Sequence, residues 1–372
     1  MPTIGDPLRI GRRCALKHRI VMAPMTRLRA DDDHVPQDMV FDYYSQRATV
    51  PGTLLITESA FISQYARGRD ENAPGIYSEA QIEAWRRITD EVHSKGSFIF
   101  MQLWHVGRAA RQRALDKAGL ESLSSSDIPI SSDFPKPRPM TEEEIVQCIE
   151  YFSQAAMNAM RAGFDGVEIH GANGYLIDQF TQDVSNRRTD RWGGSVENRS
   201  RFCLEVTKAV VKAIGADRTA VRLSPFSDFQ GMRMADPVPQ FTHLAENLRS
   251  LNLAYLHLIE PRVSGITDRD AGAADALDFI VDVWKEASPI VFAGGYTTDK
   301  AEEALRVGLN GGSAAFAFGR HFISNPDLPY RLLHDQPLTP YDRNTFYSVK
   351  DARGYTNYTV CNAWNDHLGT KM

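Results

Sequence analysis

The stretch Gly166-Val-Glu-Ile-His170-Gly-Ala-Asn173-Gly-Tyr175 decides the fold of this chain. Its first five residues, 166–170, form a short run with the β-branched residues Val167 and Ile169, which favours a strand. The segment before it, Thr141–Arg161, carries apolar residues at helical spacing. Strand runs that alternate with helical segments indicate a parallel sheet.

The same kind of run recurs outward from this stretch, toward both ends of the chain. Little polar alternation interrupts the runs, as expected for strands that are buried on both faces. There are eight of them: Arg19–Ala23, Thr53–Glu58, Phe98–Leu103, Gly166–His170, Ala220–Ser224, Ala254–Ile259, Ile290–Gly294 and Ala314–Gly319. Eight such strands in a chain of 372 residues predict an α/β fold closed into a (β/α)8 TIM barrel.

Helical patterns fill most of the segments between the runs. Ser78–Ser94 begins with Ser78 as an N-cap, and Thr141–Arg161 begins with the capping-box pattern Thr-Glu-Glu-Glu. Ser195–Ala213 and Thr298–Arg306 open with similar residue types. We therefore predict four of the barrel helices at these positions.

Two segments fall outside the barrel pattern. Thr3–Lys17 holds apolar residues around a turn at Gly11, and we expect a hairpin that closes the bottom of the barrel. The stretch 105–139 is long, polar and rich in Ser and Pro, and loops of that length are usually functional. We expect it to cap the C-terminal mouth; a surface insertion without a role is the alternative. One domain over 1–372 is expected.

The charge balance disfavours a nucleic-acid partner. The net charge is −5 and the sequence pI is about 6.1, whereas binding to a phosphate backbone needs a concentrated basic face. One local cluster, Arg187, Arg188 and Arg191, is interrupted by Asp183 and Asp190. We interpret it as a solvated loop.

Cysteine spacing and hydropathy indicate which cellular compartment fits this chain. Cys14, Cys148, Cys203 and Cys361 are scattered and form no C-x-x-C pair. This spacing disfavours a zinc ribbon, a cysteine-ligated iron–sulfur cluster and a disulfide framework, and it fits a reducing compartment. No apolar run has the length of a signal peptide or of a membrane span, which needs ~20 residues. We expect a cytoplasmic protein with no metal site and no membrane partner.

The predicted site lies at the C-terminal ends of the strands, as in other barrels of this class. Gly294-Gly295 and Gly319-Arg320 follow the last two strands, where TIM barrels commonly bind phosphate. Glycines let the backbone approach a phosphate, and the arginine adds a fork of donors. The ends of the other strands show no paired acids of a glycosidase and no Ser-His-Asp arrangement.

His170, Asn173 and Tyr175 form the sharpest local feature. Two donors that converge on one point can hold a carbonyl or anionic oxygen, and a nearby phenol can donate a proton. Arg222 lies in a mostly apolar strand, so an anion is expected beside it. That anion is a phosphate, the negative charge of a reduced flavin, or a carboxylate such as Glu58 or Glu168.

At these residues the chain resembles the Old Yellow Enzyme family of FMN-dependent ene-reductases, yeast-like and fungal branch. The resemblance spans nearly the whole chain, and its central block, Gly166–Phe180, is highly specific. Other matching stretches are Met22–Arg27, Thr57–Ser59, Gln102–Trp104, Asn186–Phe202, Val221–Pro225, Tyr255–His257, Ala293–Gly295 and Phe318–Arg320. The fungal reductases of secondary metabolism, including those of ergot pathways, are also similar.

The resemblance implies a set of FMN contacts: Pro24, Met25, Thr26, Ser59, Gln102, Arg222, Gly294, Gly295, Gly319 and Arg320. Thr26 would donate to the O4 side of the flavin, Gln102 would bind its pyrimidine edge, and Arg222 would face the N1–C2 side. Ser59 departs from the family, in which a small Gly or Ala is common, and we expect this change to be tolerated.

The resemblance also implies the substrate site. His170 and Asn173 would hold the substrate carbonyl oxygen and Tyr175 would be the proton donor. Four further residues would shape the pocket: Phe61, Trp104, Phe229 and Tyr347, the last of them in a C-terminal extension, 335–372, that lines the site. Some ergot-pathway members have Phe at the position of the proton donor and isomerise; Tyr175 favours net reduction.

The implied activity is NAD(P)H-dependent reduction of the C=C bond of an α,β-unsaturated carbonyl compound, an enone or enal, by a ping-pong mechanism. NADPH or NADH would share the flavin site, which agrees with the lack of a G-x-G-x-x-G after a strand. A flavin-dependent isomerase or desaturase on the same scaffold is the main alternative. A non-enzymatic flavin-binding protein would be expected to lose the His170, Asn173, Tyr175 set. A monomer or a homodimer is expected.

Overall fold

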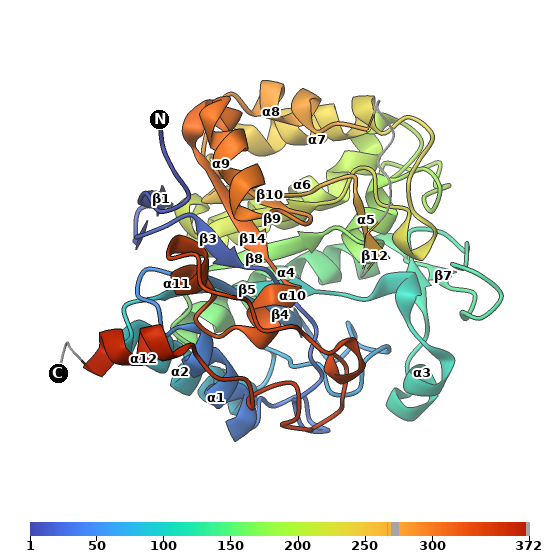
Figure 1. The fold of residues 1–372 in the computed structure, drawn as a ribbon. Helices are drawn as coiled ribbons and strands as arrows, with labels where there is room; N and C mark the ends of the chain where they lie inside the picture. The colour runs from blue at the N-terminus through green and yellow to red at the C-terminus, as the bar shows by residue number, and fades with distance from the viewer. Residues whose placement is uncertain (266, 269–274, 370–372) are drawn as a thin grey trace.

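Eight parallel strands form a closed barrel in the computed structural model, which describes residues 1–265, 267–268 and 275–369 (Figure 1). In chain order they are β3 (Ile20–Met22), β4 (Leu54–Phe61), β5 (Phe98–Trp104), β8 (Gly166–Gly171), β9 (Thr219–Leu223), β10 (Tyr255–Ile259), β13 (Ile290–Ala293) and β14 (Ala314–Phe318). Each strand pairs with the next, and β14 pairs with β3 to close the ring. The predicted TIM barrel and all eight predicted strands are confirmed.

The barrel strands are buried on both faces, which explains their continuous apolar character. Strand β4 differs most from its prediction, because it continues past Glu58 to Phe61. Its pairing with β5 shifts in register between Ile56 and Ser59. Such an irregularity re-aims side chains near active sites, and here it lies where the strand reaches the mouth of the barrel.

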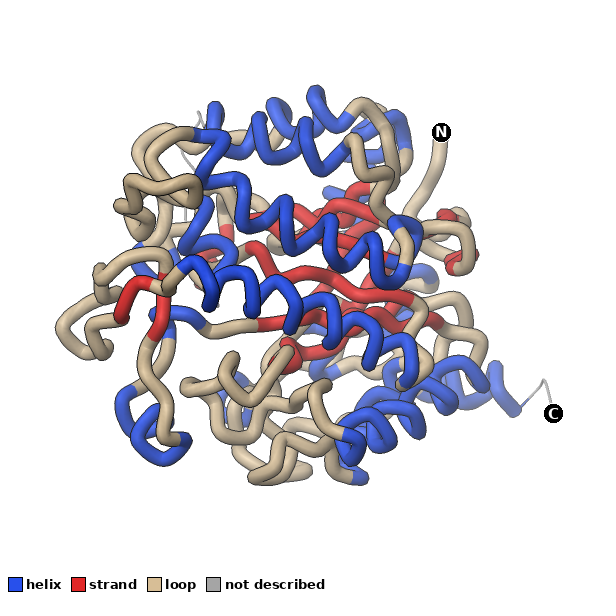
Figure 2. Tube along the Cα trace, turned by 180° about the vertical axis from the view of Figure 1, so that it is seen from behind, coloured by secondary structure: helices blue, strands red, loops and turns tan. Residues whose placement is uncertain are grey.

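Helices surround the barrel, as Figure 2 shows for those on its rear face. The predicted helices correspond to α2 (Glu79–Ser94), α4 (Glu142–Arg161), α6 (Val196–Ile214) and α9 (Thr298–Arg306). The remaining helices are α1 (Asp38–Arg47), α3 (Gln112–Ala118), α5 (Leu176–Thr181), α7 (Val238–Arg249), α8 (Asp278–Trp284), α10 (Arg320–Ser324), α11 (Leu328–Leu333) and α12 (Asn362–Gly369). The capping boxes at Ser78 and Thr141 are present, whereas α9 is capped by Thr297 and not by Thr298.

The N-terminal hairpin consists of β1 (Leu8–Ile10) and β2 (Cys14–Leu16), paired antiparallel. Its apolar side chains pack on the inner residues of the barrel strands, among them Phe100 and Tyr255. The turn at Gly11 has φ +54°, and a Cβ there would overlap the carbonyl oxygen of Asp217, just before β9 begins. The hairpin therefore lies at the N-terminal end of the strands, as predicted.

The stretch 105–139 contains η1 (Gly107–Ala109), α3, β6 (Leu123–Ser124) and β7 (Arg138–Pro139). Helix α3 lies away from the barrel, at the lower right of Figure 1. Arg108 ties the stretch to the loop after β9 by donating to the carbonyl oxygens of Gln230 and Gly231, each at 3.2 Å. It thus lies beside the mouth of the barrel.

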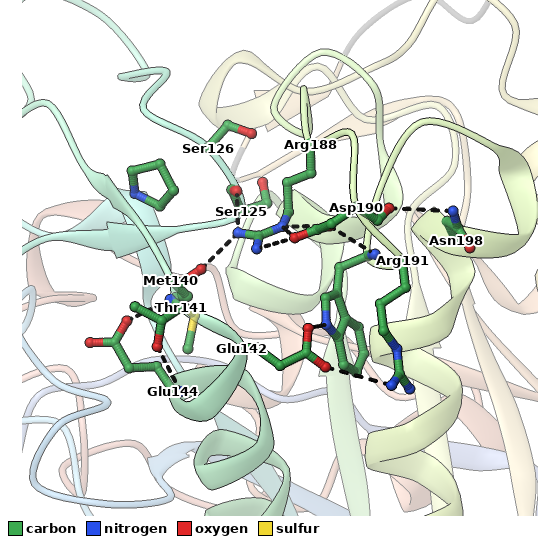
Figure 3. Close-up of polar contacts among 12 residues, drawn as sticks. Ser125, Ser126, Met140, Thr141, Glu142, Glu144, Arg188, Asp190, Arg191 and Asn198 are labelled. Atoms are coloured by element: carbon green, nitrogen blue, oxygen red, sulfur yellow. Dashed lines mark hydrogen bonds and ion pairs between the residues drawn. The ribbon is translucent and has the colours of Figure 1, made fainter.

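The arginine cluster lies in a loop with Arg187 and Arg191 exposed, as expected, but Arg188 is anchored, which corrects our interpretation for that residue (Figure 3). Arg188 has only 11% of its side chain exposed. It pairs with Asp190 and donates to the carbonyl oxygens of Ser125 (3.1 Å) and Met140 (2.7 Å). Arg191 lies 3.6 Å from Glu142, in the first turn of α4. Two of the three arginines, Arg188 and Arg191, therefore have an acidic partner within reach.

Glu58, at the bend in β4, gives the fold a predicted dependence on pH. Its carboxylate accepts from the backbone N–H of Arg27 at 3.0 Å, yet burial raises its pKa from 4.5 to about 7. The folded state therefore binds this proton more tightly than the unfolded chain. Protonation of Glu58 therefore stabilises the folded state; this contribution to the free energy of unfolding is complete below about pH 4.5 and is lost as the pH rises through about 7.

We expect Glu58→Gln to flatten this dependence. Between about pH 5 and pH 8 the free energy of unfolding of the unchanged protein should fall by about 2 kcal/mol more than that of the variant. Urea unfolding at fixed FMN concentration measures both slopes. Asp178, whose buried carboxyl also has its pKa raised to about 7, remains in both proteins as an internal control. Parallel pH profiles would contradict the prediction.

Candidate active site

A cavity of about 610 Å³ opens at the C-terminal ends of the barrel strands, and residues at the ends of all eight contribute to it. It brings together most of the residues that the sequence predicted: Pro24, Met25, Thr26, Ser59, Gln102, His170, Asn173, Tyr175, Arg222, Phe229, Gly294, Gly295, Gly319, Arg320 and Tyr347. A site assembled from such distant stretches follows from the barrel topology, which gathers all strand ends at one rim.

Phe61 and Trp104 lie one layer behind the cavity and do not line it. Their rings stack on each other with centroids 4.9 Å apart. Trp104 then presents its edge to the ring of Tyr175, also at 4.9 Å. Trp104 therefore supports Tyr175 from the rear, and Phe61 supports Trp104 in turn.

Tyr175 and His170 face each other in the cavity, with ring centroids 5.0 Å apart. Burial lowers the pKa of His170 to about 3, and the neighbouring Arg222 acts in the same direction. The imidazole is therefore neutral at physiological pH. Its Nδ1 is buried and has no hydrogen-bond partner within the described part of the chain. A buried polar atom of this kind calls for a ligand.

Burial raises the pKa of Tyr175 to about 12, so the phenol carries its proton at neutral pH. A neutral His170 beside a protonated phenol can donate a hydrogen bond without competing for the phenolic proton. Proton donation by Tyr175 is thus compatible with the electrostatics of the site.

Asn173 adopts a left-handed conformation, φ +58°, which Asn tolerates better than most residues. Its backbone is held on both sides: the N–H donates to Ser224 Oγ at 2.8 Å, and the carbonyl accepts from Gln230 Nε2 at 2.6 Å. The backbone of the turn after β8 is therefore fixed before any substrate binds, with Asn173 and Tyr175 both at the cavity.

A buried polar network lies under the middle of the cavity, centred on Glu168. Its carboxylate accepts from Gln102 Nε2 (2.7 Å) and Tyr255 Oη (3.0 Å) and contacts His257 Nδ1 (2.7 Å). These contacts and the charge of Arg222 keep the pKa of Glu168 low, although burial opposes them.

The network bears on which anion lies beside Arg222, a question that the sequence left open. The charge of Glu168 acts on Arg222, but its oxygens bond to Gln102, Tyr255 and His257. Arg222 Nε is buried and without a hydrogen-bond partner in the residues that the structure describes. An electronegative ligand in the cavity would satisfy this donor.

Ser59 adds a contact that the sequence did not predict. Its Oγ donates to Gln102 Oε1 at 2.5 Å, while Gln102 Nε2 donates to Glu168. The two bonds fix which end of the amide is the acceptor and which the donor. Ser59 therefore sets the orientation of a side chain expected at the flavin's pyrimidine edge.

Gly294, Gly295, Gly319 and Arg320, which the sequence predicts to bind phosphate, line the part of the cavity that we call its phosphate end. Gly294 and Gly295 have φ angles of +142° and +68°, and a Cβ at Gly295 would overlap the guanidinium of Arg262. Backbone N–H groups exposed by glycines, together with two nearby guanidinium groups, suit a phosphate. At the other end, the unsatisfied donors of His170 and Arg222 suit the oxygen-bearing edge of a flavin and a substrate. The residues present therefore fit FMN.

A TIM barrel whose cavity fits FMN and brings a histidine, an asparagine and a phenol together is typical of a flavin-dependent oxidoreductase. The model of the NADH:flavin oxidoreductase / NADH oxidase family matches residues 4–339. The chain is 40% identical to the Old Yellow Enzyme homologue of Zymomonas mobilis, with a TM-score of 0.89 and coverage of 97% of this chain and 100% of that one. The chain belongs to the Old Yellow Enzyme family.

Fungal relatives are more similar in sequence. The chanoclavine-I aldehyde reductase of Penicillium roqueforti is 55% identical over 359 residues, 96% of each chain. A relative from Claviceps purpurea, described as a "probable inactive dehydrogenase", is 48% identical over 358 residues, 94% of this chain and 93% of that one.

The chain is an FMN-dependent ene-reductase that uses NAD(P)H as its reductant. Among the described residues, no helix is long and apolar enough to cross a membrane.

The cavity also contains residues that sequence reasoning missed: Arg69, Asp70, Arg262, Tyr341 and Phe346. The last two come from the C-terminal extension, which buried arginines after β3 hold in place. Arg27 Nε donates to the carbonyl oxygen of Phe346 at 3.1 Å, and Arg29 Nη1 to the same oxygen at 2.9 Å. Arginines fixed on distant backbone carbonyls leave no pattern in the local sequence.

We expect Gly295→Ala to weaken FMN binding about tenfold, because the new Cβ meets both an unfavourable positive φ and the crowded phosphate end. Equilibrium titration of the apoprotein with FMN measures the Kd. Gly308→Ala is the matched control: its φ is +78°, but no atom lies within 4 Å of its Cβ. It should lower stability to a similar extent without changing the Kd for FMN. Equal FMN affinities in the two variants would contradict the assigned phosphate end.

Proposed function

We propose that the protein reduces the C=C bond of an α,β-unsaturated aldehyde or ketone in two half-reactions that share one cavity, a ping-pong mechanism. The observation that carries the proposal is the convergence of His170, Asn173 and Tyr175 on the cavity that fits FMN. The aldehyde reductase of Penicillium roqueforti supports an enal as the substrate class.

Each residue has a proposed task. His170 and Asn173 donate to the substrate carbonyl oxygen and so draw electron density away from Cβ. Tyr175 donates its phenolic proton to Cα. Gln102, oriented by Ser59 and Glu168, and Arg222 hold the pyrimidine side of the cofactor.

Bound FMN supplies hydride transfer, accepting it from NAD(P)H and giving it to Cβ. The other cofactor contacts are proposed from Thr26, from the flanking Pro24 and Met25, and from the glycines and Arg320 at the phosphate end. Phe229 and Tyr347 shape the remaining wall, with Phe61 and Trp104 as support for Tyr175.

A flavin-dependent isomerase or desaturase remains the second candidate, since it would need the same cavity. The Claviceps relative is described as a "probable inactive dehydrogenase", so a direct measurement of turnover is the relevant test. Retention of Tyr175 supports net reduction here, because saturation of a C=C bond needs a proton at Cα as well as a hydride at Cβ.

We propose that residues 1–372 form one domain, in which the stretch 105–139 caps the mouth of the barrel. No residue of that stretch lines the cavity, so it would act through the loop after β9, to which Arg108 ties it. Cys14, Cys148 and Cys203 are buried free thiols, which supports a cytoplasmic location. The protein is proposed to be a monomer or a homodimer.

An anaerobic stopped-flow experiment tests the activity. NADPH is added to the FMN-loaded protein, and 2-cyclohexenone or a simple enal is mixed in after the flavin absorbance has bleached. We expect rapid recovery of the flavin band together with formation of the saturated product. Bleaching without recovery for any enone or enal would contradict ene reduction and favour the isomerase or desaturase alternative.

A further inference from the structure

Arg69 is a charged residue of the cavity that the mechanism above does not use. It lies in the loop after β4, and only 17% of its side chain is exposed. Its guanidinium carbon is 5.8 Å from the centre of the Tyr175 ring. A cation is therefore held beside the group to which we assign proton donation.

Several contacts fix the position of this cation. Arg69 Nη1 donates to Gln230 Oε1 at 2.9 Å and to the carbonyl oxygen of Ala109 at 3.2 Å. Its Nε lies 3.3 Å from Asp70 Oδ2. Because a guanidinium held at three points needs little reorganisation, its field is oriented before any reaction occurs.

The same contacts connect Arg69 to the rest of the site. Gln230 accepts from Arg69 through Oε1 and donates from Nε2 to the carbonyl oxygen of Asn173 at 2.6 Å. The Gln230 side chain also acts on Tyr175, whose pKa it lowers. Arg69 is thus joined through one amide to the turn that carries Asn173.

The charge matters because Tyr175 becomes negative when it reacts. Its O–H bond breaks, a C–H bond forms at the substrate Cα, and the phenolate left behind regains a proton from solvent. Burial opposes this step by raising the pKa of Tyr175, whereas Arg69 and the Gln230 side chain lower it. Asp70 and Tyr347 also raise the pKa of Tyr175, so Arg69 is the cation that opposes them.

We propose that Arg69 is a positioning residue for proton donation: fixed by Gln230, Ala109 and Asp70, it stabilises the negative charge that Tyr175 acquires as its proton leaves. Arg69 itself transfers no proton. The proposal rests on the proposed function, in which Tyr175 is the proton donor.

The test compares Arg69→Gln, Arg69→Lys and a neighbouring control, Arg67→Gln, in proteins with Tyr175 and with Phe at that position. Arg67 donates only to the nearby carbonyl oxygen of Gln64 in the contacts that the structure records, and it does not line the active-site cavity. Anaerobic stopped flow gives the rate constants of flavin reduction by NADPH and of reoxidation by 2-cyclohexenone. The solvent deuterium isotope effect is measured on reoxidation.

With Tyr175 present, we expect Arg69→Gln to slow reoxidation about tenfold and to raise its solvent isotope effect, since a charge about 6 Å away is worth roughly that much at a partly shielded site. Flavin reduction should not change, and Arg69→Lys should recover most of the rate. In the Tyr175→Phe background, Arg69→Gln should have no further effect, because the charge acts through the phenol. Arg67→Gln should behave like the unchanged protein.

An equal loss of rate from Arg69→Gln in both backgrounds would overturn the proposal and assign Arg69 to substrate binding or to loop structure. An Arg69→Lys variant as slow as Arg69→Gln, or an unchanged isotope effect, would also overturn it. If Tyr175→Phe alone leaves reoxidation fast, the proton-donor assignment in the proposed function fails, and that result is distinct from a failure of Arg69.

Discussion

Replacing Tyr175 by Phe should slow reoxidation of the reduced flavin by an enone about 10²–10⁴-fold, the usual contribution of a general acid. The change removes one oxygen and keeps the ring, whose packing against Trp104 and His170 should therefore survive. The pKa of about 12 means that the phenol is fully protonated at neutral pH, so the loss should be similar from about pH 6 to pH 9. Stopped-flow absorbance in the flavin band measures the rate constant of reoxidation.

The same sample provides the control for this prediction. Flavin reduction by NADPH needs no proton from Tyr175, so its rate constant should remain close to that of the unchanged protein. FMN content and the melting temperature should also be preserved, which would exclude a folding defect. Equal losses in both half-reactions would show that Tyr175 shapes the cavity and does not donate the proton.

The barrel could be predicted from the sequence because its information is local. Strand runs such as Leu54–Ile56 and Ala314–Phe318 are buried on both faces and therefore carry a continuous apolar signal. Capping residues such as Ser78 and Thr141 mark where helices begin, and the structure confirms both. The predicted boundary failed at the end of β4, where the strand continues to pair with its neighbour β5 through Phe61 after a shift in register.

The parts of the site that were missed depend on contacts between distant segments. Arg69 and Asp70 lie in a loop with no periodic pattern, and only the folded loop brings them to Tyr175. Phe61 and Trp104 were assigned to the pocket wall, but whether a side chain lines the cavity or lies behind its lining depends on packing, which strand position does not reveal. The solvated interpretation of Arg188 was wrong for the same reason, since its carbonyl partners are 48 and 63 residues away.

Replacing His170 by Ala should weaken the binding of phenolate-type ligands and slow enone reduction about 10²–10³-fold, as loss of one oxyanion donor does. His170 is neutral because burial and Arg222 lower its pKa to about 3, so it acts as a hydrogen-bond donor and not as a cation. Its contribution to phenolate affinity should therefore stay constant as the pH passes through about 6.5, the usual imidazole value. Only the ionisation of the added phenol should shape the pH profile.

Titration of the flavin spectrum with a phenol, at several pH values, measures this affinity in both proteins. His243→Ala is a suitable control, because His243 lies on the outer helix α7 and contacts Ser200 Oγ at 3.0 Å. If His170→Ala and His243→Ala both leave the Kd for the phenol unchanged, the oxygen must be held by other donors, such as Asn173. If affinity in the unchanged protein falls through about pH 6.5 and the variant lacks that fall, His170 binds as an imidazolium, and the argument from its burial is wrong.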